Sequence, residues 1–234
     1  MRLMKILGIL GGIAPESTIE YYRLIVASYR AKVPGGDYPE LIINSINLKK
    51  MLDMIGANEL ARVTDYLAGE VRKLARAGAD FGILASNTPH IVFEELQRES
   101  PIPLLSIVES VCEETRRLGL KRVGLFGTRF TMQGRFYSEV FSRYGIEIVT
   151  PDPEEQGFIH DRYMSELVNA IFLPETRERL LMIVERLKAE AGIEGLILGG
   201  TELPLILRDT GDAGIPFLDT TRIHAEQAVA HMLS

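Results

Sequence analysis

Short apolar stretches alternate with longer amphipathic stretches along nearly the whole chain. The apolar stretches are typical of strands, and the amphipathic ones carry apolar residues at the three- and four-residue spacing of a helix. In the first half, the paired segments are 5–12 with 16–30, 40–47 with 58–78, 81–86 with 88–99, and 103–108 with 109–119. This alternation predicts an α/β fold with a mostly parallel sheet and helices on both of its faces.

The second half of the chain repeats this order. Its segments are 122–127, 131–145, 146–151, two helical stretches on either side of Pro174, 193–200, and a last strand and helix within 216–233. Three matching pairs, Gly8 with Gly124, Ser86 with Gly200 and Pro103 with Pro216, are separated by offsets of 116, 114 and 113 residues. We therefore predict two pseudo-symmetric doubly wound halves, formed by residues 1–118 plus 215–234 and by residues 119–214. A ligand site is expected in a cleft between the halves, because open α/β sheets bind ligands at the carboxyl ends of their strands.

Four loops at the predicted strand ends carry small residues and hydroxyls just before a helix. They are GGIAPEST at 11–18, ASNTPH at 85–90, GTRFTM at 127–132 and GGTELP at 199–204. Ser, Thr and Asn at such places often only cap helices. Because helix N-terminal amides also bind carboxylates and phosphates, four such loops at symmetric positions favour an anion site as well as capping. The predicted substrate-binding residues are Gly12, Ile13, Asn87, Thr88, Thr128, Thr131 and Thr201.

Composition narrows the classes of partner. The formal net charge is −6 and no run of Lys or Arg occurs, which disfavours nucleic-acid and polybasic membrane surfaces and favours a small-molecule partner. The sequence has one cysteine, its start is unlike a signal peptide, and it has no apolar run of the ~20 residues that a membrane helix needs. These features predict a cytoplasmic protein. The sequence lacks GxGxxG, a Walker motif and zinc-ligand spacing, so we expect no cofactor and no metal.

The histidines and the cysteine are weak catalytic candidates. His90 lies in a predicted site loop and could orient a ligand, although histidines near a helix start are more often structural. His160 and His224 are interpreted as helix-face or interface groups. Cys112 falls on the apolar side of its helix, which predicts a buried, inert thiol.

All these motifs together resemble the aspartate/glutamate racemase superfamily, and especially its broad-specificity amino-acid racemase branch. The resemblance spans the chain and rests on LGILGG with ESTIEYYRLI, NTPH, LFGTRFTM, GGTELPL and FLDTTRIHAE. It implies a PLP-independent, metal-free isomerase of two pseudo-symmetric halves, commonly a homodimer, that moves the α-proton of a small amino acid or related carboxylate. In that family two cysteines, in a CNT and a GCTE loop, face each other across the substrate. One thiolate removes the proton and the other thiol returns one, which suits a group whose pKa of ~8.5 can be lowered by helix N-termini.

Both cysteine positions differ in this chain. The first motif reads Ser86-Asn87-Thr88, and the broad-specificity branch resembles it in carrying a hydroxyl residue there. The second reads Gly200-Thr201-Glu202, so Gly200 provides neither an acid nor a base. Glu202 is interpreted as an orienting carboxylate at a helix start, with a general base as the alternative. The predicted catalytic positions are Ser86, Gly200 and Glu202, and His90 is the other group near enough in sequence to activate Ser86.

These departures leave other functions open. Where aspartate-specific relatives carry a lysine in an xVKAG pattern, this chain has Val168-Asn169-Ala170, and Lys49 and Lys50 are interpreted as surface lysines. Aspartate is therefore disfavoured as the substrate. A decarboxylase or lyase needs fewer bases than a racemase, and a carboxylate-binding protein needs none.

Overall fold

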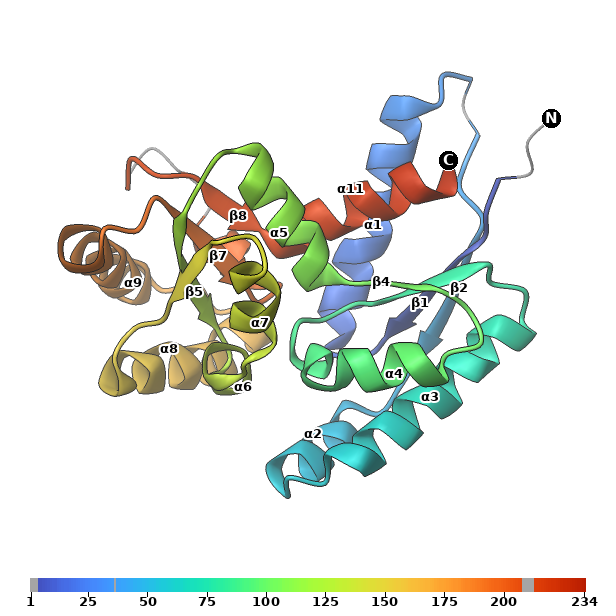
Figure 1. The fold of residues 1–234 in the computed structure, drawn as a ribbon, viewed down its shortest axis with the longest axis horizontal. Coiled ribbons are helices and arrows are strands. Elements are labelled where there is room, and N and C mark those ends of the chain that lie inside the picture. The colour runs from blue at the N-terminus through green and yellow to red at the C-terminus, as the bar shows by residue number, and fades with distance from the viewer. Residues whose placement is uncertain (1–3, 36, 208–212) are drawn as a thin grey trace. The chain divides into compact units, whose positions relative to one another are not determined.

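The computed structural model describes residues 4–35, 37–207 and 213–234, which form two four-stranded, entirely parallel sheets (Figure 1). The strand orders are β2-β1-β3-β4 and β6-β5-β7-β8, so the two sheets repeat one topology. The strands are β1 (Leu7–Gly11), β2 (Leu41–Ser45), β3 (Phe81–Leu84), β4 (Leu104–Leu105), β5 (Arg122–Gly127), β6 (Glu147–Val149), β7 (Gly195–Gly199) and β8 (Phe217–Asp219). The predicted α/β fold of two similar halves is confirmed.

Helices connect the strands in the order that the sequence predicts, with one further helix at Leu48–Gly56 that was not predicted. They are α1 (Pro15–Lys32), α2 (Leu48–Gly56), α3 (Leu60–Arg76), α4 (Phe93–Glu99), α5 (Ile107–Arg117), α6 (Arg129–Gln133), α7 (Phe136–Ser142), α8 (Pro153–Ser165), α9 (Pro174–Arg186), α10 (Leu203–Ile206) and α11 (Thr220–Met232). Short 3₁₀ turns cover Thr88–Val92 and Leu167–Asn169, and a π-helical stretch covers Leu187–Ala191. None of the described helices has both the length and the apolar character needed to cross a membrane.

One predicted amphipathic segment, residues 131–145, is divided between two helices. Gly134 ends α6 in an extended conformation, with its N–H donating to the carbonyl of Phe130, and α7 begins at Phe136. The apolar spacing continues across this break, so the sequence pattern does not reveal it.

The core of the first sheet shows the two-residue alternation of a strand buried on both sides. Leu7 and Ile9 of β1 belong to the cluster that α1 and α11 complete, whereas a Cβ added at Gly8 would lie 3.3 Å from Leu74 of α3. Helices therefore cover both faces of this sheet. The residues that α1 and α11 contribute to this cluster are Tyr21, Ile25, Tyr29, Ala225, Ala228, Val229 and Met232.

The second sheet has its own core. Phe126 of β5 and Leu196 and Leu198 of β7 pack in one buried cluster with residues of α8 and α9. The predicted repeat holds at its markers, because Gly8 and Gly124 lie in the equivalent strands β1 and β5. The loops that carry Ser86 and Gly200 likewise follow the equivalent strands β3 and β7.

The contacts within the chain divide it into two units. The first unit consists of the residues up to Ile107 together with His224–Ser234, and the second unit is Val108–Ile223. The predicted placement of the last strand in the first half is wrong, because β8 pairs with β7, with Leu196 opposite Phe217. Most of α11 joins the first unit as predicted, since its small apolar residues pack in the first core. Residues 108–118, predicted in the first half, are grouped with the second unit.

Candidate functional site

In the first unit, two of the predicted loops lie at the same edge of the sheet, because β1 and β3 are parallel neighbours. Gly12 follows β1 with φ +80°, and a Cβ there would lie 2.5 Å from the carbonyl oxygen of Ile46, so this position requires glycine. The N–H of Gly12 donates to Thr18 Oγ1 at 2.8 Å, and Ile13 is buried beside it. The first turn of α1 therefore fixes the backbone of this loop.

The second loop holds the first of the two family positions. Asn87 and Thr88 are buried at the start of the 3₁₀ turn, whereas Ser86 is half-buried. Ser86 is thus the most accessible side chain of the three, which suits the residue predicted to face a substrate.

His90 is a structural residue of this loop and not a base for Ser86. Its Nε2 accepts the N–H of Ile107 at 3.1 Å, and its Nδ1 therefore carries the proton, which it donates to the Ser86 carbonyl at 3.0 Å. Burial, and next the nearby His224, lower the pKa of His90 to about 3. With both ring nitrogens engaged, His90 holds the loop against the start of α5.

His224, predicted on a helix face or interface, is instead buried within the first unit. Its Nε2 donates to the carbonyl of Leu105 at 3.0 Å, and its Nδ1 accepts the hydroxyl of Tyr21 at 2.8 Å. Burial lowers the pKa of His224 to about 4. His160 lies half-buried on α8, where Nδ1 accepts the N–H of Arg129 at 3.2 Å.

In the second unit, β5 and β7 are parallel neighbours, and their loops again lie at one edge. Thr128 caps α6, with Oγ1 accepting the N–H of Thr131 at 3.3 Å, and the two threonine hydroxyls lie 3.1 Å apart. Thr131 is fully buried, and its methyl group would lie 3.1 Å from a Cβ at Gly199. The capping role is confirmed for Thr128, whereas Asn87 precedes its 3₁₀ turn without a side-chain capping bond. The substrate-binding role of these residues, and the sharing of one cleft by all four loops, stay predictions.

At the second family position, the space beside Gly200 is filled by Tyr163 of α8. A Cβ at Gly200 would lie 2.5 Å from Cε2 and 2.8 Å from Oη of that ring. The phenol donates to Glu202 Oε2, and the hydroxyl of Thr201 donates to the same oxygen at 2.7 Å. Burial, and next the negative charge of Glu202, raise the pKa of Tyr163 well above its usual 10.

Sequence reasoning missed Tyr163. Tyr163 follows Ile159 by four residues on the buried side of α8, and this spacing is typical of a core aromatic. Glu202 was expected to orient groups at a helix start, but its carboxylate accepts two hydroxyls in a buried cluster. No local signal relates α8 to Glu202, 39 residues further along the chain.

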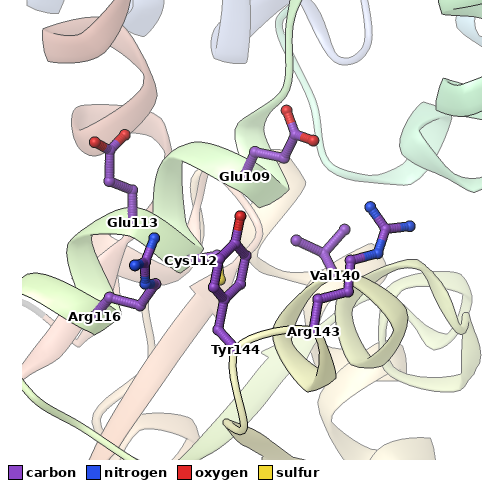
Figure 2. Close-up of a pocket in the computed structure, with 7 residues that line it drawn as sticks. All are labelled: Glu109, Cys112, Glu113, Arg116, Val140, Arg143 and Tyr144. Carbon is purple, nitrogen blue, oxygen red and sulfur yellow. The ribbon is translucent and has the colours of Figure 1, made fainter.

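A separate pocket of about 380 Å³ lies within the second unit and contains none of the predicted site residues. Glu109, Glu113 and Arg116 line it from α5, and Arg143 and Tyr144 line it from the turn that follows α7 (Figure 2). The Arg116 guanidinium lies 4.2 Å from the centre of the Tyr144 ring. Cys112 lines the same pocket but is 1% exposed, so its predicted burial is confirmed. Burial also raises its pKa to about 11, and the inertness of the thiol stays a prediction.

The two lysines and the asparagine that the sequence analysis singled out make local contacts. Lys49 and Lys50 are both exposed on α2. Lys49 forms an ion pair with Asp53 at 2.6 Å, and the Lys50 ammonium lies 4.3 Å from the centre of the Tyr66 ring. Asn169 donates to the carbonyl of Ser165 at 3.1 Å. Within the described residues, no three His, Cys, Asp or Glu side chains are grouped as metal ligands would be.

Comparison with known proteins identifies the family of the chain. The family model described as Asp/Glu/Hydantoin racemase matches residues 10–228. The chain belongs to the Asp/Glu/hydantoin racemase family. Among curated relatives, the broad specificity amino-acid racemase RacX of Bacillus subtilis (strain 168) is 30% identical over 97% of this chain and 98% of its own length. The chain is therefore a racemase-family isomerase.

Solved structures agree with this membership. An aspartate racemase homologue from Pyrococcus horikoshii OT3 superposes with a TM-score of 0.86 at 36% identity, covering 99% of this chain and all of that one. The aspartate racemase of Picrophilus torridus has a TM-score of 0.78 at 22% identity over 97% of this chain and 94% of its own, which supports the shared fold.

Proposed function

We propose that this racemase-family chain transfers the α-proton of a small amino acid or a related carboxylate without a cofactor. The observation that carries the proposal is the match to a broad specificity amino-acid racemase over 97% of the chain. The paired strand-end loops add support, since each places hydroxyl or amide residues between a strand and the helix that follows it, where carboxylates bind well.

The proposed substrate-binding groups are the glycine, amide and hydroxyl residues of these loops. They are Gly12, Ile13, Asn87, Thr88, Thr128, Thr131 and Thr201. In this proposal, helix-start amides and hydroxyls hold the carboxylate and stabilise the negative charge that develops when the α-proton leaves. Ser86 and Gly200 occupy the two family cysteine positions, and Glu202 lies next to the second.

A second candidate is a decarboxylase or lyase on the same scaffold, or a carboxylate-binding protein without turnover. The observation that favours it is the absence of a thiol from both family positions, because Ser86 and Gly200 stand there and the one cysteine, Cys112, is buried elsewhere. Racemisation requires proton transfer on two faces of the α-carbon, whereas cleavage followed by protonation requires one. For the natural chain we accordingly expect weak or undetectable racemisation of free aspartate and glutamate.

The remaining features of the proposal concern cofactor and assembly. We propose a PLP-independent and metal-free protein that acts in the cytoplasm as a homodimer, with small carboxylates as partners and without nucleic-acid or membrane binding. The family resemblance and the net charge of −6 support this. A stoichiometric visible chromophore or a monomeric mass by light scattering would contradict it.

The experiment combines binding and turnover on one panel of amino acids, including both enantiomers of aspartate, glutamate, alanine, lysine and arginine. Thermal shift detects binding, proton NMR in deuterated water detects α-proton exchange, and chiral chromatography detects the product. Exchange supports the isomerase, binding without exchange supports the binding protein, and loss of carbon dioxide or ammonia supports the lyase. Ser86→Ala should lower exchange, while Ser142→Ala, an exposed serine on α7, should not.

A further inference from the structure

Tyr163 occupies the place that a side chain at position 200 would take. A Cβ built on Gly200 would lie 2.5 Å from Cε2, 2.8 Å from Oη and 2.9 Å from Cζ of the phenol ring. Real Cβ atoms essentially never approach other atoms below 3.0 Å, so a cysteine at 200 and this tyrosine position exclude each other. The phenol ring and its hydroxyl therefore occupy the space that the side chain of the second family cysteine would need.

This hydroxyl is hydrogen-bonded to a buried carboxylate. Tyr163 donates to Oε2 of Glu202, and Thr201 donates to the same oxygen at 2.7 Å. Tyr163 and Glu202 are 6% and 5% exposed, so bulk water has little access to either side chain. A buried carboxylate that accepts a phenol hydrogen bond can take the phenol proton when the phenol oxygen accepts another.

We propose that Tyr163, acting with Glu202, replaces the missing second cysteine as the acid–base group for one face of the substrate α-carbon. The inference rests on the proposed function. Tyr163 would be the catalytic residue that contacts the α-proton, and Glu202 would be the positioning residue that receives or supplies the proton behind it.

The step balances in both directions. In the forward direction, the phenol oxygen takes the α-proton while the phenol's own proton passes to Glu202 Oε2, and the C–H electron pair stays on the substrate as a carbanion. In the reverse direction, Tyr163 gives its proton to the α-carbon and takes the proton held by Glu202. The phenol is neutral before and after each step, which agrees with the burial that disfavours its phenolate.

Removing the hydroxyl alone is the first test, in a chain whose only cysteine has been changed by Cys112→Ser. Tyr163→Phe should lower α-proton exchange by about 100-fold or more, because a general acid–base group contributes that much. The loss should apply to the enantiomer whose α-proton faces Tyr163, whereas a distorted site would slow both enantiomers. Tyr137→Phe, at a fully buried tyrosine of α7 in the same unit, is the matched control and should keep the exchange rate.

Glu202→Gln tests the relay without removing the hydrogen bond, because the amide oxygen still accepts from Tyr163. It should lose exchange to a similar extent while retaining ligand-induced thermal shift. This variant also decides the question if Tyr163→Phe proves unstable. Full exchange in folded Glu202→Gln would overturn the relay.

A thiol rescue supplies a readout that a structural role could not give. Tyr163→Ala vacates the space beside residue 200, and adding Gly200→Cys places a thiol there. The double variant should exchange at least about 10-fold faster than Tyr163→Ala alone, and iodoacetamide should abolish only this gain. No gain in a folded, ligand-binding double variant would contradict the shared position of phenol and thiol.

The outcomes separate the two proposals. If the natural chain exchanges no α-proton on the whole panel, the proposed function fails and the role of Tyr163 fails with it. If the natural chain exchanges and folded Tyr163→Phe exchanges equally fast for both enantiomers, the isomerase stands and the role of Tyr163 is refuted.

Discussion

Replacing His90 by glutamine should make the first unit less sensitive to mild acid than the natural protein. His90 is buried and neutral because one ring nitrogen accepts the N–H of Ile107 and the other donates to the Ser86 carbonyl. Its folded pKa of about 3 lies below the ordinary 6.5, so the unfolded chain binds the proton more readily. The stability that this histidine contributes is fully present above pH 6.5 and is lost as the pH falls toward 3.

The magnitude at pH 5 depends mainly on the unfolded value. The folded pKa lies well below 5 and the unfolded one about 1.5 units above it, which corresponds to a loss of about 2 kcal/mol for one histidine. His224, with a pKa lowered to about 4, should lose a similar amount by the same mechanism. The natural protein should therefore lose about 4 kcal/mol from the two histidines between pH 7 and pH 5, in addition to any contribution from carboxylates.

The assay compares variants so that the carboxylates cancel. Urea unfolding followed by circular dichroism at pH 7 and pH 5 gives the stability gap between His90→Gln and the natural protein. This gap should shrink by about 2 kcal/mol at the lower pH, because glutamine keeps an acceptor for Ile107 but takes up no proton.

Gln97→Met is the matched control for this assay. Gln97 Oε1 accepts the N–H of Leu104 at 2.9 Å, so this variant also removes a side-chain acceptor near β4, but one that does not titrate. Its gap to the natural protein should not change with pH. If the gap of His90→Gln is equally constant, His90 is not a buried neutral group and the reasoning is refuted.

Three further predictions test the packing. Gly12→Ala should destabilise the protein by more than about 2 kcal/mol, because residue 12 has a positive φ and an added Cβ would lie 2.5 Å from a carbonyl oxygen. The control Gly69→Ala, in open space within α3, should stabilise the protein by about 0.5–1 kcal/mol. Urea unfolding midpoints measure both changes. Gly200→Cys alone should cost about 1–3 kcal/mol through overlap with Tyr163, and an unchanged melting temperature would contradict this. Cys112, with its pKa raised to about 11, should resist a disulfide exchange reagent at pH 8 until the chain is denatured, and rapid native labelling would show it accessible.

The sequence by itself determined the repeated α/β architecture. Strands buried on both sides read as continuous apolar runs, and helices show their four-residue spacing, so most elements are visible in their own segments. Helix α2 and the break between α6 and α7 were not predicted. Three matching pairs with similar offsets, among them Gly8 with Gly124, related the two halves. The grouping of the strand-end loops could be predicted as well, because all strands of a parallel sheet have their carboxyl ends at the same edge.

Only the tertiary structure decided which distant side chains meet. Tyr163 reads as a core aromatic of α8, and its contact with Glu202 depends on how that helix packs on the second sheet. Likewise, Tyr21 and His224, 203 residues apart, bond because α1 and α11 share a core. Periodicity reports which face of an element is buried but not which neighbour covers it, since that choice depends on the packing of the whole unit. For the same reason, the pairing of β8 with the second sheet could not be predicted from its own residues.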